Sequence, residues 1–415
     1  MSRRSVLAGA AAGVPLLLSP GLLRAAEPDL SALAPMTGDV VPIGPDERRA
    51  RIARAQALMA VSGIGAILVE AGSSLIYFTG VRWGRSERLT AAVIPARGDP
   101  IIVTPFFEEP SVRESLGIPA EIRVWQEDED PLALVAAFCR ERGVAGQPIG
   151  VEETVRYFAV DGLQRAMPGV RLVSANPVVR GCRMIKTPAE IALMQRATDV
   201  TIAAYRWLWP RIEVGMTSAD VSALMTAATR KLGGAPEFAL VLVDAAAALP
   251  HGTRKPGRIA AGSVILMDCG CTVEGYQSDV SRTFVKGTPT AEVARVWQQV
   301  HAGQATAFSA ARIGAAAGSV DDAVRAQYER AGYGPRYRLP GLSHRTGHGI
   351  GMDGHEPVNL VHGETTRLAA GMCFSDEPGL YLPGKFGVRL EDCFHVTAEG
   401  PRWFSTPPAS LDLPV

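Results

Sequence analysis

The chain has 415 residues, of which 47% are hydrophobic and 20% charged, and its 42 lysines and arginines balance 42 aspartates and glutamates. This length corresponds to two or three domains with cores of their own, and a neutral, apolar-rich composition excludes an intrinsically disordered protein. With no net charge, the chain has no general attraction for nucleic acid or for an anionic membrane surface, so neither is expected as a partner.

The first 27 residues are expected to be a targeting segment that is not part of the fold. The string SRRSVL from Ser2, followed by an apolar stretch over 6–18, resembles a twin-arginine export signal. That stretch is too short for a transmembrane helix, which needs about 20 apolar residues. The resemblance implies a protein exported folded to the periplasm, with an uncleaved membrane anchor as the alternative.

The six cysteines are expected to be free. None of their spacings is typical of a disulfide framework or of a CxxC metal site. Folding before export would also take place in a reducing compartment, where disulfides are rare. The sequence therefore predicts buried thiols at Cys139, Cys182, Cys269, Cys271, Cys373 and Cys393.

An α/β domain is expected over residues 46–178. After a linker rich in proline and glycine, Asp46 is expected to cap a helix that runs to about residue 60. Helical stretches at 132–142 and 158–167 then alternate with short apolar runs at 66–70, 75–80, 91–96 and 101–105. Runs of this length interleaved with helices predict strands of a mixed α/β fold.

A second domain is expected over residues 185–405. Its start is marked by Thr187, Pro188 and Glu190, which together combine an N-cap, a proline in the first turn and a capping-box glutamate. The helix that they open should end before Pro210.

This second domain contains an internal repeat. The segment RIEVGMTSADVSAL from Arg211 is echoed by RIGAAAGSVDDAV from Arg312, with Thr217 and Ser319 as the expected helix caps. Strand-rich sequence with one histidine and two acids follows each pair of helices: His251, Asp268 and Asp279 in the first copy, and His348, Glu377 and Glu391 in the second. Such a repeat predicts a pseudo-symmetric domain with its site between the copies.

The acids of each copy are spaced as partners in a hairpin. Asp268 should end an apolar strand, and a turn near 273–274 would bring Asp279 directly opposite it; Glu377 and Glu391 are symmetric about Gly384. Opposed residues in a hairpin have Cβ atoms about 4.5–5.5 Å apart. Carboxylates this close repel each other unless a cation lies between them, and two divalent ions about 3.5–4 Å apart are the simplest solution.

Five motifs carry a specific resemblance. They are ALPHG from Ala248, MDCG…GYQSDVSRTF from Met267, SHRTGHGIG…HE from Ser343, EPGLY from Glu377 and GVRLED from Gly387. In this order they resemble the pita-bread metallopeptidases, which include prolidase (Xaa-Pro dipeptidase) and Xaa-Pro aminopeptidase. The N-terminal half resembles the creatinase-type domain through SSLIYFTG from Ser73. The resemblance implies an α+β fold, in which a pseudo-two-fold pita-bread catalytic domain follows a smaller α/β domain.

The resemblance also implies a role for each site residue. Asp279 and Glu391 would bridge two divalent ions, Asp268 would bind one of them, and His348 and Glu377 the other. A set of oxygen ligands with one imidazole favours Mn²⁺, with Co²⁺ and Zn²⁺ as alternatives. Catalytic or substrate-binding roles are implied for Glu377 and for His251, His344, His355 and Arg389.

The implied activity is hydrolysis of X–Pro bonds by a homodimeric exopeptidase. A hydroxide held between the ions would attack the scissile carbonyl, Glu377 would transfer protons, and His251 or His355 would stabilise the oxyanion. Xaa-Pro dipeptidase and Xaa-Pro aminopeptidase both remain open, and ALPHG is closer to the dipeptidases. The alternatives are a hydrolase or lyase of a small non-peptide C–N substrate, and a non-catalytic binding protein. Creatinase-type members and the binding proteins lack part of the metal-ligand set, whereas this chain has all five ligands.

Overall fold

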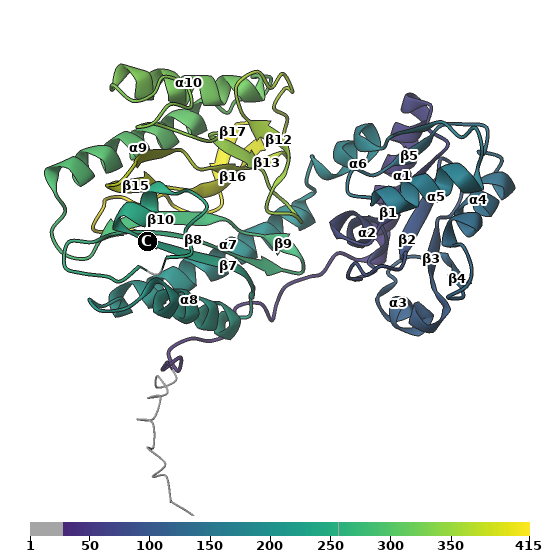
Figure 1. Ribbon diagram of the computed structural model, residues 1–415, viewed down its shortest axis with the longest axis horizontal. Helices are drawn as coiled ribbons and strands as arrows, with labels where there is room; N and C mark the ends of the chain where they lie inside the picture. The colour runs from purple at the N-terminus through teal and green to yellow at the C-terminus, as the bar shows by residue number, and fades with distance from the viewer. Residues whose placement is uncertain (1–27, 256) are drawn as a thin grey trace, which may run out of the picture.

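The computed structural model describes residues 28–255 and 257–415, and the expected export signal lies outside these residues. Two domains lie side by side, joined between helices α6 (Asn176–Arg183) and α7 (Pro188–Leu208) (Figure 1). Residues 28–44 run along the second domain before they enter the first, and the Met36 amide donates a hydrogen bond to the Leu232 carbonyl (2.8 Å). None of the helices in the described ranges has the length and apolar character that a membrane span requires.

The N-terminal domain is built on one mixed sheet of six strands in the order β4-β3-β2-β1-β5-β6. Its strands are β1 (Ala66–Glu70), β2 (Ala91–Pro95), β3 (Ile101–Pro105), β4 (Glu121–Trp125), β5 (Ile149–Val151) and β6 (Leu172–Ser174). Its helices, besides α6, are α1 (Pro45–Ser62), α2 (Ser73–Thr79), η1 (Phe106–Glu108), α3 (Glu109–Ser115), α4 (Pro131–Glu141) and α5 (Tyr157–Ala166).

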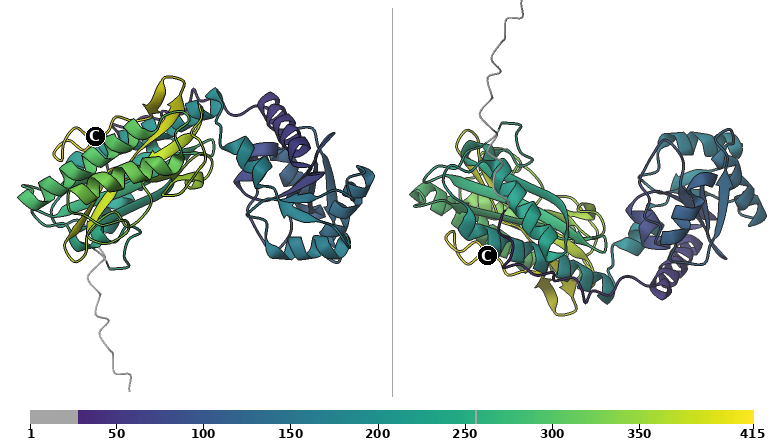
Figure 2. Two further views of the ribbon diagram at one scale, coloured as in Figure 1. Left: turned by 90° about the horizontal axis from the view of Figure 1, so that it is seen from above. Right: turned by 90° about the horizontal axis from the view of Figure 1, so that it is seen from below.

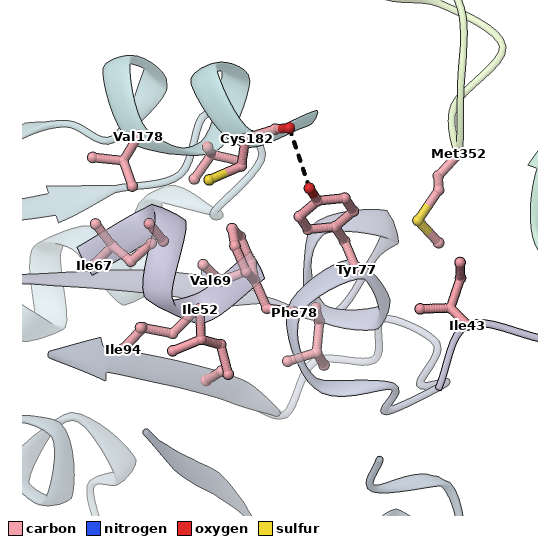
Figure 3. Packing of buried hydrophobic residues seen from close by; sticks show 14 of the residues in the cluster. Ile43, Ile52, Ile67, Val69, Tyr77, Phe78, Ile94, Val178, Cys182 and Met352 are labelled. Carbon is pink, nitrogen blue, oxygen red and sulfur yellow. Dashed lines mark hydrogen bonds between the residues drawn. The ribbon is translucent and has the colours of Figure 1, made fainter. Parts of the chain in front are cut away.

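Both faces of this sheet are buried. On β1, Ile67 and Val69 belong to the apolar cluster under α1 and α6, whereas Ala66 and Leu68 face the cluster under α4 and α5. Figure 3 shows the first cluster, in which the Tyr77 hydroxyl donates to the Cys182 carbonyl (3.2 Å). Because α6 packs into this cluster, the N-terminal domain continues beyond residue 178.

The strands predicted at 66–70, 91–96 and 101–105 are confirmed, but two other predictions in this domain are wrong. The apolar run at 75–80 belongs to α2 rather than to a strand. An apolar run this short does not distinguish the residue period of a helix from that of a strand, so tertiary packing decides which of the two forms. Asp46 lies in the first turn of α1, whose N-cap is Gly44.

The C-terminal domain consists of two copies of a helix pair followed by strands. The first copy contains α7, η2 (Trp209–Arg211), α8 (Ser218–Leu232), β7 (Ala235–Val243), η3 (Asp244–Ala248), β8 (Val264–Val273), β9 (Tyr276–Gln277) and β10 (Val280–Val285). The second contains α9 (Ala291–Ala310), α10 (Ala317–Arg330), β11 (Gly347–Gly349), β12 (Glu356–Leu360), β13 (Cys373–Asp376), β14 (Gly379–Leu382), β15 (Phe386–Arg389), β16 (Asp392–Thr397) and β17 (Gly400–Trp403).

The predicted repeat is confirmed in the order of these elements. Helices α9 and α10 lie over one side of the strands, and helices α7 and α8 lie over the other side (Figure 1). The view from above therefore shows α9 and α10 in front, and the view from below shows α7 and α8 in front (Figure 2). The two strand systems meet where Ser281 and Glu391 exchange backbone hydrogen bonds (3.1 and 3.2 Å).

The helix caps follow the prediction in one copy only. Thr187 forms the predicted capping box of α7, which ends before Pro210. Thr217 is the N-cap of α8 as predicted, and the structure adds a capping box with Asp220. Ser319, however, does not cap α10, because that helix begins at Ala317 with Ala316 in the N-cap position. The six cysteines are free and buried, as predicted.

A buried ion network fixes the connection between the domains. Glu356, at the start of β12, lies 2.5 Å from Arg183 Nη2 and 2.9 Å from Lys186 Nζ. Burial on its own would raise the pKa of Glu356, but the charges of Arg183 and Lys186 outweigh it and lower the pKa to about 2. The carboxylate therefore stabilises the fold in its ionised form.

Glu356→Gln is expected to lower the free energy of unfolding by about 2 kcal/mol at pH 7, because buried Lys186 loses its counter-charge and Arg183 keeps only that of Asp353. The pKa of Glu356 is lowered on folding, so its contribution is complete above about pH 4.5 and is lost as the pH falls toward 2. The difference in melting temperature between wild type and variant should therefore narrow between pH 5 and 3. The exposed Glu399→Gln serves as the control, and a difference independent of pH would contradict this expectation.

Candidate metal centre

All nine side chains that the sequence indicates line one cavity of about 630 Å³ in the C-terminal domain. The first copy of the repeat contributes through β8, the β9–β10 segment and the loop after η3, and the second through the segments from 344 to 391. The nine are His251, Asp268, Asp279, His344, His348, His355, Glu377, Arg389 and Glu391.

The first pair of acids lies close together, but in a different register from the prediction. Asp268 lies within β8 rather than at its end, and it pairs with Ser281 rather than with Asp279. The turn contains Glu274 and Gly275, both with positive φ (50° and 84°), as a two-residue type I′ turn requires. Asp279 thus lies two residues before Ser281, the actual partner of Asp268, and its side chain is on the same face of the hairpin.

The second pair follows the predicted register. Asp376 pairs with Asp392 on one side, and Gly379 pairs with Arg389 on the other. The same register places Glu377 opposite Glu391, between the two ladders. Since β10 and the segment before β16 are joined at Ser281 and Glu391, this pair is brought against the first one.

The acids converge on one imidazole. Asp279, His348 and Glu391 each offer a ligand atom, and these three atoms lie within 4.8 Å of one another. His348 Nε2 also lies 3.8 Å from Asp279 Oδ2 and 3.5 Å from Glu377 Oε1. Asp279 Oδ1 and Glu391 Oε1 are buried and accept no hydrogen bond from the described residues. Buried carboxylate oxygens without a donor are the arrangement that a bound cation would satisfy.

The electrostatics of the site favour a cation as well. Burial, followed by the negative charge of Glu391, raises the pKa of Asp279 well above its usual range. Burial, followed by the negative charge of Glu377, does the same for the pKa of Glu391, and the pKa of Glu377 rises to about 7. Burial also holds the pKa of His348 well below 6.5, so the ring is neutral and available as a ligand. The residues present therefore fit divalent metal ions.

Arg389 supports Asp268 from beside the cluster. Its Nη2 forms an ion pair with Asp268 Oδ2, and its Nε donates to the Ser281 hydroxyl oxygen (2.9 Å). Ser281 Oγ in turn lies 3.0 Å from Asp268 Oδ1 and 2.7 Å from Glu391 Oε2. Arg389 and Ser281 thus hold two of the four carboxylates in a fixed relative orientation.

Three further histidines surround the cluster. His344 Nδ1 donates to the Arg345 carbonyl (2.7 Å), so its Nε2 accepts from the Tyr381 hydroxyl (2.7 Å). Burial lowers the pKa of His344 to about 3, which keeps this ring neutral. The ring of His355 lies 4.2 Å from that of His348, edge to face, and His251 is exposed at the cavity.

Two family models match the chain: metallopeptidase family M24 over residues 192–398, and the creatinase/prolidase N-terminal domain over residues 51–185. A Mycobacterium tuberculosis protein named probable dipeptidase PepE is 35% identical over 355 residues, which cover 84% of this chain and 92% of that protein. The chain belongs to metallopeptidase family M24.

Solved structures support the same assignment for this M24 peptidase. Dipeptidase PepE from Mycobacterium ulcerans has a TM-score of 0.83 at 33% identity, with 90% of this chain and 100% of that chain covered. A recombinant prolidase from Thermococcus sibiricus has a TM-score of 0.79 at 29% identity, with coverages of 86% and 97%. The predicted fold class is confirmed, and so is the prediction of a metallopeptidase, a hydrolase that depends on metal ions.

Two residues at the site of this M24 peptidase are missing from the sequence prediction. Ser281 contacts Asp268, Glu391 and Arg389, and Arg345 lines the cavity. Ser281 could have been found from the strand period, since it lies two residues after Asp279 and so faces the same side. For Arg345, the one indication in the sequence was its position between the two predicted site residues His344 and His348.

Proposed function

We propose that this M24 peptidase is an exopeptidase that hydrolyses X–Pro bonds with two divalent ions per chain. The observation that carries the proposal is that buried carboxylate oxygens, which have no hydrogen-bond donor within residues 28–255 and 257–415, converge on a neutral imidazole. The names of its relatives agree with this substrate class: a protein from Lactobacillus helveticus that is 30% identical over 341 residues, covering 80% of this chain and 90% of that protein, is named Xaa-Pro dipeptidase.

The five predicted ligands divide between the two ions. Asp279 and Glu391 would hold both ions, Asp268 would complete one site, and His348 with Glu377 the other. This oxygen-rich set favours Mn²⁺. When bound, the ions would lower the pKa of a water molecule and polarise the scissile carbonyl.

The chain's own groups handle protons and charge in the reaction. Glu377 accepts the proton of the attacking water and passes it to the proline nitrogen, which must be protonated to leave as an amine. His251 and His355 are the ring N–H donors that face the developing oxyanion, and they need not be charged for this role. Arg389 and Ser281 keep Asp268 and Glu391 in place while the substrate reacts.

The cavity also offers apolar surface for a proline ring. Its lining includes five apolar or aromatic side chains: Phe238, Leu240, Pro250, Tyr337 and Val361. An X–Pro bond has no N–H to donate, so a site for it needs apolar shape rather than a backbone acceptor at that atom. This lining therefore supports proline as the residue after the scissile bond.

In the presence of Mn²⁺, kcat/KM for Ala-Pro is expected to exceed that for Ala-Ala by about 10- to 100-fold, the range that pocket fit supplies. Ala-Pro-Ala in the same assay separates dipeptidase from aminopeptidase activity. Treatment with a chelator should remove turnover, and Mn²⁺ should restore it. Equal rates for Ala-Pro and Ala-Ala would exclude proline specificity, and hydrolysis of a small C–N compound such as creatine instead of any peptide would favour the alternative substrate class.

Export and homodimer formation belong to the same proposal. Export rests on the twin-arginine-type string at residues 2–7, and the homodimer on the two-domain organisation of the family. Cell fractionation and light scattering of the purified protein test these two parts separately.

A further inference from the structure

Strand β7 carries a β-bulge beside the active-site cavity. Pro236 pairs with Cys271 and Phe238 with the adjacent Gly270, so Glu237 is the extra residue of the bulge. Successive side chains of a regular strand face opposite sides of the sheet, whereas a bulge can turn two neighbours toward the same side. Glu237 and Phe238 accordingly both line the cavity. The bulge thus presents a carboxylate in the cavity beside an aromatic side chain.

The Glu237 carboxylate is available to a cationic group of a ligand. Glu237 is exposed at the cavity, and no lysine, arginine or histidine within residues 28–255 and 257–415 forms an ion pair with it. Two arginines line the same cavity, but both are engaged elsewhere. Arg389 is paired with Asp268, and Arg345 lies where the cavity adjoins the cleft between the domains.

Gln277 adds a second acceptor to this part of the cavity. The residue is only 6% exposed, and its Oε1 accepts no hydrogen bond from the part of the chain that the structure describes. Thr272 of β8 pairs with Ala235 on β7 and with Gln277 on β9, so Glu237 and Gln277 approach the cavity from the two sides of β8. A carboxylate and an amide oxygen that both lack a donor are suited to a ligand with several N–H groups.

The distance from the metal centre selects the part of the substrate that can reach Glu237. Asp268, a predicted metal ligand, pairs with Leu240, three residues after Glu237 on β7. At about 3.4 Å per residue, Glu237 lies roughly 7–10 Å along the strand from the level of Asp268. The α-ammonium group of a substrate is only two bonds from the scissile carbonyl carbon and stays near that level. A lysine side chain has a four-carbon stem that can span the distance, and Phe238 and Leu240 offer apolar surface to its methylenes.

We propose that Glu237, together with Gln277, binds the side chain of a basic residue before the proline, so that the peptidase prefers Lys-Pro and Arg-Pro. This inference rests on the proposed function and specifies its substrate class. The proline ring has no N–H, and the C-terminal carboxylate is repelled by Glu237, so only the residue before proline can supply the cation. The ammonium or guanidinium group donates to the carboxylate, and a further N–H donates to Gln277 Oε1.

The test compares Lys-Pro with norleucyl-proline, whose side chain has the same four-carbon stem and no charge. In the presence of Mn²⁺, wild type is expected to prefer Lys-Pro by roughly 10-fold in kcat/KM, mainly through KM, as a charged hydrogen bond supplies. Glu237→Gln should remove this preference, with a larger loss for Lys-Pro than for norleucyl-proline. Glu237→Lys should favour Glu-Pro instead. Glu274→Gln, which changes a surface carboxylate paired with Arg82, is the control and should leave the preference unchanged.

Ionic strength gives a second readout, because salt screens charges that are exposed to solvent. The preference of wild type for Lys-Pro should shrink as salt is added, whereas the ratio of the two rates in Glu237→Gln should stay constant. Melting temperature and metal content identify a variant that has merely unfolded.

Three results would overturn this inference and leave the proposed function intact. Wild type could cleave the two peptides equally fast, or the preference for Lys-Pro could survive in Glu237→Gln. Glu237→Gln could also slow both peptides by the same factor, which would mean that the carboxylate binds the α-ammonium group that both share. If wild type loaded with Mn²⁺ turned over none of the proline peptides, the proposed function would be overturned as well.

Discussion

Asp279→Asn is expected to lower kcat/KM for Ala-Pro by roughly 10³-fold or more, because it removes a carboxylate that both ions are proposed to share. The substitution keeps the shape of the side chain and removes only the charge. The measurements are kcat/KM with Mn²⁺ and the number of metal ions per chain by elemental analysis. The variant is expected to retain fewer ions than wild type.

The same variant should be no less stable than wild type when both are free of metal. Asp279 is almost fully buried, its Oδ1 has no donor among the described residues, and its pKa is raised by burial and by Glu391. Asparagine avoids the burial of that negative charge. Melting temperatures of chelator-treated proteins measure this, and addition of Mn²⁺ should stabilise wild type much more than the variant.

Glu274→Gln is the matched control, since Glu274 lies in the turn of the same hairpin and pairs with Arg82 at the surface. Its kcat/KM should stay within roughly twofold of wild type. Normal turnover in Asp279→Asn would exclude the proposed mechanism. Loss of turnover together with a large loss of metal-free stability would instead make Asp279 a structural residue.

The gathering of these side chains in one cavity was predictable although one register was wrong. The turn of the first hairpin lies one position later than expected. Glu274 adopts a positive φ there, which is uncommon for a glutamate and so could not be predicted from the residue type. A shift of the turn by one position moves each cross-strand partner by two, and a shift of two keeps every side chain on its face. Asp268 and Asp279 therefore still point into the same cavity.

Residues that act across the two copies of the repeat were harder to predict. Ser281 takes part in the site because β10 docks against the segment before β16, and Arg345 because the N-terminal domain closes the cleft behind it. Local patterns such as the helix caps at Thr187 and Thr217 depend on a few neighbouring residues and could be read directly. Contacts between distant segments depend on how whole elements pack, which periodicity does not encode.

Arg282→Met is expected to lower the free energy of unfolding by about 4 kcal/mol, the largest effect on stability that we predict outside the cavity. Arg282 is fully buried, and its Nη2 lies 2.7 Å from Asp392 Oδ1, which is also fully buried. Its other donors bind the carbonyls of Pro414 (2.6 Å) and Glu391 (2.8 Å). Removal of the guanidinium leaves a carboxylate buried without its counter-charge.

Urea unfolding at pH 7 measures this loss, and a double-mutant cycle identifies its source. Arg282→Met combined with Asp392→Leu should be less destabilised than the sum of the two single variants, because no unpaired charge remains. The exposed pair of Arg165 and Asp161 is the control, and Arg165→Met should cost less than about 0.5 kcal/mol. Strictly additive effects at positions 282 and 392 would show that the ion pair is not the cause. Arg282 also donates a hydrogen bond to the carbonyl of Glu391, one of the proposed metal ligands. Arg282→Met on its own should therefore bind Mn²⁺ more weakly, which would connect this buried ion pair to the proposed metal site.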